Sequence, residues 1–139
     1  GITVLHGDVD EPLPFPDDSF DGAVLKDLLE HVADPVKLVL EVRRVLRPGG
    51  VVFASSPDAQ RWVWNDYTHR RPFTRKAFRL LFSDQGWTVR EVGYESVMPG
   101  TAACSVERTS SRRSRTSGSK PARYSSTVVG LSATTSTRW

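Results

Sequence analysis

Short blocks of hydrophobic residues with different spacings follow one another along the first 98 residues. Apolar runs at 2–5 and 20–25 predict strands, and the run at 51–54 is apolar enough to predict a strand buried on both faces. Between the last two runs, apolar residues recur at helical spacing, at Leu38, Val39, Val42, Val45 and Leu46. Alternating strands and helices predict an α/β layer architecture around a mainly parallel sheet.

Capping residues mark where the predicted helices begin. Asp34 is suited to cap a helix that has Pro35 at its first position. Thr74 is suited to cap a second helix, which we expect to end at Gly86. The alternating residues 87–94 then predict a fourth strand.

The regular pattern stops near Met98. Residues 99–139 contain 17 Ser and Thr, and few large apolar side chains. Ordering about 40 residues costs roughly 1–2 kcal/mol each in backbone entropy, which so little apolar surface does not offset. We therefore predict a folded domain over 1–98 and a disordered tail over 99–139, without stable tertiary contacts from about Thr101 onward.

The basic character of the chain is confined to this tail. The net charge is +3, yet residues 1–98 hold 12 Lys and Arg against 15 Asp and Glu, whereas residues 99–139 hold seven against one. The tail has only Tyr124 and Trp139 as aromatic residues, so we predict no nucleic-acid partner. One cysteine, no membrane-length apolar run and no secretion signal predict a cytoplasmic protein without a membrane partner.

Three motifs at characteristic spacing carry a family resemblance: LPFPDDSFD at 13–21, LLEHVADP at 28–35 and RRVLRPGG at 43–50. Together they resemble class I S-adenosylmethionine-dependent methyltransferases, in the small-molecule branch that includes ubiquinone and menaquinone biosynthesis enzymes. The resemblance covers about residues 5–98. It implies a partial doubly wound, Rossmann-like sheet, S-adenosyl-L-methionine as cofactor, and a small-molecule acceptor that is methylated on oxygen, nitrogen or carbon.

The resemblance also implies positions for the cofactor. Asp8 would accept a hydrogen bond from the adenine amino group, with the Val9 amide beside it, and Leu25 and Lys26 would line the methionine end. The family's Gly-rich turn and ribose-binding acid are not found in the chain, so we expect two βα units to precede Gly1 in a complete domain. We therefore expect methyl transfer from the complete domain, and we expect the chain on its own to be inactive and not to hold the cofactor. An abrupt change of composition near 99–104 suggests a shifted reading frame. The alternative interpretation is a non-catalytic α/β fragment or interaction module.

The stretch DLLEHV at 27–32 raises the question of a metal site. If it is helical, Asp27, Glu30 and His31 share one face. Some ubiquinone-pathway O-methyltransferases carry a similar pattern that is linked to a divalent metal. Acidic residues also favour a helix start without any metal, and three ligands on one turn leave a shell incomplete. We therefore predict no metal here.

Residues 62–73 combine aromatic and basic side chains in the region where this family recognises its acceptor. Trp64, Tyr67 and Arg70 are predicted to contact the acceptor. His69 is the candidate catalytic residue, a general base toward an acceptor hydroxyl, because histidine titrates near neutrality.

Overall fold

A computed structural model describes residues 3–94, 101–108 and 128–131. Two α-helices, a short 3₁₀ helix and five strands follow one another in the order β1 (Phe20–Lys26), α1 (Pro35–Val45), β2 (Leu46–Pro57), η1 (Arg61–Asn65), α2 (Arg75–Ser83), β3 (Trp87–Tyr94), β4 (Thr101–Arg108) and β5 (Val128–Leu131). No helix in the described ranges is both long enough and apolar enough to cross a membrane.

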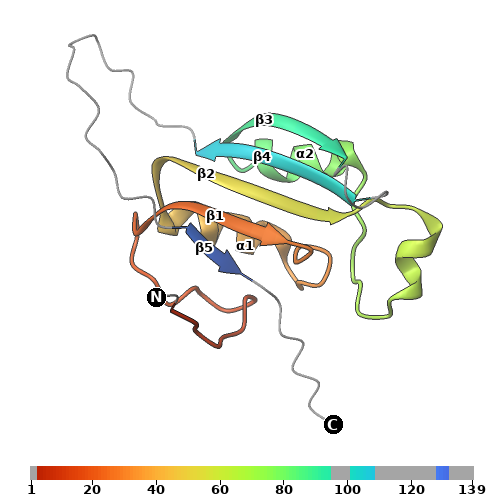
Figure 1. Cartoon of the computed structure of the whole chain (residues 1–139), viewed down its shortest axis with the longest axis horizontal. Coiled ribbons are helices and arrows are strands. Elements are labelled where there is room, and N and C mark those ends of the chain that lie inside the picture. The colour runs from red at the N-terminus through yellow and green to blue at the C-terminus, as the bar shows by residue number, and fades with distance from the viewer. Residues whose placement is uncertain (1–2, 95–100, 109–127, 132–139) are drawn as a thin grey trace.

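The strands form one mixed sheet in the order β3-β4-β2-β1-β5 (Figure 1). β1 is parallel to β2 and to β5, whereas β4 is antiparallel to β2 and β3. Helices α1 and α2 contact each other and cover the same face of this sheet. The predicted α/β class with a partial doubly wound sheet is therefore confirmed, with one face covered by described helices.

Both helices begin where the sequence predicts. The Asp34 carboxylate accepts hydrogen bonds from the amides of Val36 and Lys37, and the Thr74 hydroxyl accepts one from Ala77. Gly86 follows α2 with a φ of 76°, a left-handed conformation that glycine adopts without strain. These caps satisfy amides that would otherwise lack partners in the first turn of each helix.

The core lies between the helices and the inner face of the sheet. Buried and exposed residues alternate over residues 50–54 of β2, where Val52 and Ala54 point inward and Val51 and Phe53 are 43% and 38% exposed. The prediction that this strand is buried on both faces is therefore wrong. Over residues 51–54 the outer face is left open by the described residues, so only every second side chain there is removed from water.

The prediction of a strand at residues 2–5 is also wrong for residues 3–5, which the structure describes. Residues 3–8 form no strand, and Val4 is 86% exposed; Ile2 lies outside the described residues. A strand needs a neighbour to pair its amides and carbonyls. The outer edge of β1 is paired instead with β5, in parallel register from Gly22↔Val128 to Leu25↔Leu131.

The expected lack of tertiary contacts from Thr101 onward is wrong for two segments. Thr101–Arg108 forms β4, which lies between β2 and β3, and Val128–Leu131 forms β5. An eight-residue strand has to offset only its own ordering entropy, and β4 pairs along both edges and buries Val106 completely. The rest of the predicted tail, residues 99–100, 109–127 and 132–139, lies outside the described residues.

Arg44, on α1, forms hydrogen bonds with residues 13–17 of the loop that precedes β1. Its guanidinium donates to both carboxylate oxygens of Glu41 at 3.0 and 2.9 Å, to the carbonyls of Leu13 and Phe15, and to Asp17. Glu41 in turn accepts from the Leu13 amide at 3.1 Å. The hydrogen bond from Arg44 lowers the pKa of the Glu41 carboxyl. One arginine thus holds the loop that leads into β1.

Truncation tests the role of β4. A chain ending at residue 98 lacks the strand between β2 and β3, so we expect it to lose cooperative unfolding in urea. A chain ending at Arg108 keeps β4 and should retain a cooperative transition. In the intact chain, hydrogen exchange should be slow at the amides of β4. Equal urea midpoints for the intact chain and the chain ending at residue 98 would contradict this role.

Arg44→Met should lower the free energy of unfolding by about 1–3 kcal/mol at neutral pH, because several charge-assisted hydrogen bonds are lost. The folded-state pKa of Glu41 is depressed, so this stabilisation is present above the ordinary glutamate pKa of about 4.3 and is lost as the pH falls below it. Urea unfolding at several pH values should therefore show the two proteins converging in acid. Arg47→Met, which removes an exposed pair with Asp21, is the control and should cost at most about 1 kcal/mol. A difference that stays constant down to pH 3 would exclude the assigned role of Glu41.

Candidate functional site

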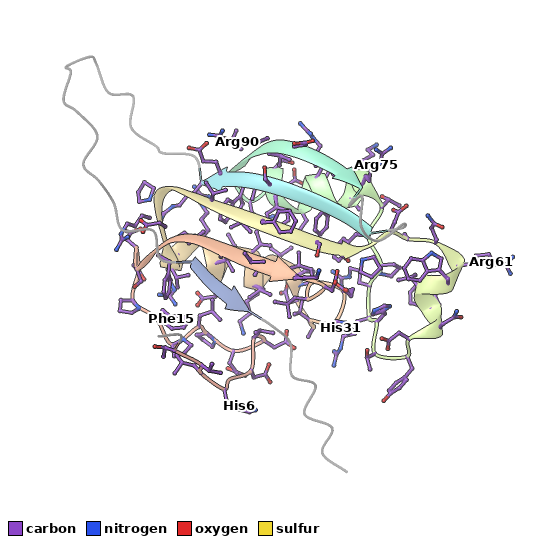
Figure 2. The ribbon with its side chains drawn as sticks, viewed as in Figure 1. His6, Phe15, His31, Arg61, Arg75 and Arg90 are labelled. Carbon is purple, nitrogen blue, oxygen red and sulfur yellow. The ribbon has the colours of Figure 1, made fainter. Side chains whose placement is uncertain are left out.

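Parallel pairing brings the carboxyl ends of β1 and β2 to the same edge of the sheet. Leu25 pairs with Ala54 and Lys26 with Ser55, after which both strands end within two residues of this register. Figure 2 shows His31 just beyond the end of β1, on the side of the loop that carries η1 and Arg61. In open α/β sheets this edge is where ligands bind.

The loop after β1 begins with a left-handed residue rather than a helix. Asp27 has a φ of 47°, and residues 29–31 form a turn. The Asp27 amide donates to the Ser55 carbonyl at 3.1 Å, and the Ser55 hydroxyl donates to the Asp27 carboxylate, also at 3.1 Å. The arrangement that would put Asp27, Glu30 and His31 on one helical face is therefore not formed.

Glu30 is a completely buried acid at the centre of this edge. Burial raises the pKa of its carboxyl, and its own amide, His31 and Ser56 offset only part of that rise. Within the described part of the chain, neither carboxylate oxygen has a hydrogen-bond partner of normal geometry. The Glu30 carbonyl accepts from the amides of Arg70 and Arg71, at 2.8 and 3.2 Å, which joins the loops after β1 and β2.

Two histidines from different loops lie beside this acid. His31 has its Nδ1 3.1 Å from the Thr68 hydroxyl, and His69 has its Nδ1 2.6 Å from the Val63 carbonyl. The ring centroids are 4.8 Å apart. The His69 side chain is 8% exposed and that of His31 is 21% exposed, so both are largely sheltered from water.

The predicted cofactor residues differ in their exposure to solvent and in their neighbours. Asp8 is exposed and accepts a hydrogen bond from the Asp10 amide at 2.9 Å, while Asp10 accepts from the Ala33 amide, also at 2.9 Å. The turn at Asp8 and Val9 therefore lies beside the loop that follows β1. Lys26 is exposed, whereas Leu25 is fully buried and its backbone lies between β2 and β5.

The predicted acceptor residues are more open to solvent. Trp64 is 59% exposed and Tyr67 is 91% exposed, and the Arg70 side chain is exposed while its amide bonds to Glu30. Sequence reasoning treated Glu30 and His31 separately from His69, and the structure brings the three together. Their positions in the sequence could have suggested this proximity, because the two segments lie in the loops that follow two neighbouring parallel strands.

Residues 1–54 match the family model described as a methyltransferase domain. The demethylmenaquinone methyltransferase of Listeria welshimeri is 34% identical over 92 residues, which are 62% of this chain and 39% of that protein. The chain therefore spans about two fifths of the length of this curated relative.

Solved structures share the fold of this chain. A chain in the Haloferax volcanii complex that contains the Trm112 methyltransferase activator superposes with a TM-score of 0.66 at 22% identity, covering 76% of this chain and 61% of that one. The SAM-dependent methyltransferase from Aquifex aeolicus gives a TM-score of 0.62 at 16% identity, over 77% of this chain and 55% of its own. Over residues 1–54 in sequence, and over most of the described chain in fold, this protein is thus similar to part of a class I S-adenosylmethionine-dependent methyltransferase domain.

Proposed function

We propose that this domain binds S-adenosylmethionine and transfers its methyl group to a small-molecule acceptor on oxygen, nitrogen or carbon. The observation that carries the proposal is the meeting of three loops at the carboxyl edge of β1 and β2, within and beside the segment that matches the methyltransferase family. The family match implies the cofactor, and the geometry supplies candidate positions for it.

The Asp8 turn has chemistry that fits the adenine end of the cofactor. A carboxylate offers about four lone-pair sites, and the Asp10 amide uses one of those on Asp8. The exposed carboxylate therefore remains able to accept from an exocyclic amino group. Val9 is partly buried against the core and presents an apolar surface next to it.

The residues of the loop after β2 are the proposed acceptor site. The exposed rings of Trp64 and Tyr67 offer apolar surface, and the guanidinium of Arg70 offers hydrogen-bond donors to a polar or anionic acceptor. Because Nδ1 of His69 is bonded to the Val63 carbonyl, its Nε2 carries the lone pair and is the atom that would accept a proton.

The main requirement of this reaction is that the acceptor atom is held in line with the methyl group and the sulfur. Bound S-adenosylmethionine supplies an electrophilic methyl group on a sulfonium. An electron pair of the acceptor would form the new bond to this carbon, the electrons of the broken carbon–sulfur bond would stay on sulfur, and His69 Nε2 would accept the proton that the acceptor loses.

The runner-up function is a non-catalytic interaction module. It is favoured by the exposed Val51 and Phe53 on the outer face of β2 and by the exposed Trp64 and Tyr67. If this apolar surface is an interaction site, the protein should self-associate in size-exclusion chromatography over a tenfold range of concentration. A monomer at all concentrations, with a cooperative thermal transition, would count against the module.

Calorimetric titration with S-adenosylmethionine tests the proposed cofactor contact. Asp8→Ala should weaken binding by about 10- to 100-fold, because a hydrogen bond to a charged group contributes about 1.5–3 kcal/mol. Glu11→Ala removes a neighbouring exposed acid and should leave the affinity unchanged. The titration uses a version extended at the N-terminus to the complete domain, and a folded complete domain that binds no S-adenosylmethionine would refute the proposed function. Equal affinities for Asp8→Ala and the parent would refute only the role of Asp8.

A further inference from the structure

Glu30, His31 and His69 form a compact cluster of metal-binding side chains. One ligand atom from each residue can be chosen so that all three lie within 4.8 Å of one another. Glu30 and His31 come from the loop after β1, and His69 from the loop after β2. The cluster is held from two sides, because the Glu30 carbonyl accepts from the amides of Arg70 and Arg71 next to His69.

The Glu30 carboxylate is the part of the cluster that points to a ligand. It is fully buried, and within the described residues both oxygens lack a hydrogen-bond partner of normal geometry. Its closest ion-pair contact is His31 Nε2, at 3.9 Å from Oε1. Buried carboxylates are normally paired, hydrogen-bonded or coordinated to a metal, because an uncompensated charge in the interior is very costly.

Hydrogen bonds engage Nδ1 of both histidines and leave Nε2 of each ring without one in the described residues. The Val63 carbonyl can only accept, so Nδ1 of His69 carries the hydrogen of that bond. The Thr68 hydroxyl donates to Asp66 at 2.6 Å and can therefore only accept from Nδ1 of His31. In both neutral rings the lone pair is then on Nε2, which is the state of a metal-ligating histidine that donates its other N–H to an oxygen.

We propose that Glu30, His31 and His69 bind a divalent transition-metal ion, with Zn²⁺ as the probe. Two imidazoles and one carboxylate form a donor set of catalytic zinc sites, where three protein ligands leave a further position open. Calcium and magnesium prefer oxygen ligands, so this set selects against them. At metal–ligand distances of about 2.0–2.1 Å, tetrahedral donors lie roughly 3.3 Å apart, so the side chains close in by about 1 Å or more on binding.

This ligand set differs from the one considered from sequence. Asp27 is engaged with Ser55 through both its amide and its carboxylate, and His69 takes the third position. Asp66 lies at the outer rim, with Oδ2 3.8 Å from His69 Nε2 and its side chain half exposed. Metal binding requires neither S-adenosylmethionine nor an acceptor, so the inference goes beyond the proposed function. With metal bound, His69 is a ligand and no longer a free base.

Zinc titration of chelator-treated protein tests the site. Each of Glu30→Gln, His31→Ala and His69→Ala should weaken Zn²⁺ binding at least tenfold in competition with a chromogenic chelator. His6→Ala removes the remaining, exposed histidine and should leave the affinity unchanged. Co²⁺ should give the visible absorption of a low-symmetry nitrogen and oxygen site, without a thiolate charge-transfer band from Cys104.

A variant at Thr68 tests whether the orientation of His31 affects the affinity for Zn²⁺. Thr68→Val removes the hydroxyl that accepts from Nδ1 of His31 and leaves the Thr68 carbonyl, 3.3 Å from that nitrogen, as the remaining acceptor. It should weaken Zn²⁺ binding by about tenfold, the lower end of what the loss of such outer partners costs. Thr68→Ser keeps the hydroxyl and should restore the parent affinity.

The parent protein alone can overturn the inference, even if every variant fails to fold. Imidazole ¹⁵N spectra should show Zn²⁺ shifting Nε2 of two histidines and leaving the third unchanged. A protein with a folded circular dichroism spectrum whose histidines do not respond to Zn²⁺ would refute the site. The same holds if folded Glu30→Gln and His69→Ala bind Zn²⁺ as tightly as the parent, which would indicate surface binding only.

Discussion

Parallel pairing between β1 and β2 is the constraint on which the candidate site depends. Two parallel strands in register end at the same edge, so the loops that follow them must meet there. Helix α1 makes the required crossover and buries Leu38, Val39 and Val42 against the sheet on the way. Residues separated by almost 40 positions, such as His31 and His69, become neighbours through this single pairing.

The N-terminal loop reaches the same edge by a different route. Arg44 and Glu41 on α1 hold residues 13–17, and Asp10 accepts from the Ala33 amide and, through its carbonyl, from Lys37. These polar contacts substitute for strand pairing, which residues 3–8 lack. The Asp8 turn is therefore positioned by α1 and by the loop before it, and its place depends on α1 being correctly packed.

The ends of the helices could be predicted from the sequence because they depend on residues within one helical turn. Asp34, Thr74 and Gly86 each act within one helical turn, so their caps could be recognised without knowing the fold. The apolar runs of β1 and β2 were predicted as strands, but the exposure of Phe53 depends on what covers the sheet. β4 pairs with the nearby β3 but was assigned to the polar tail, because Val106 is its only large apolar residue. β5 was missed because its pairing partner β1 lies far away in sequence. For the same reason His69 was considered without Glu30.

The burial of Glu30 has an evolutionary consequence. A carboxylate without partners lowers the stability of the ligand-free fold, whereas a neutral side chain of similar shape does not carry this cost. Random substitution at position 30 in a lineage released from function would thus tend to be favoured, unlike substitution at most core positions. If Glu30 holds a metal as proposed, position 30 records selection for that role separately from selection for folding.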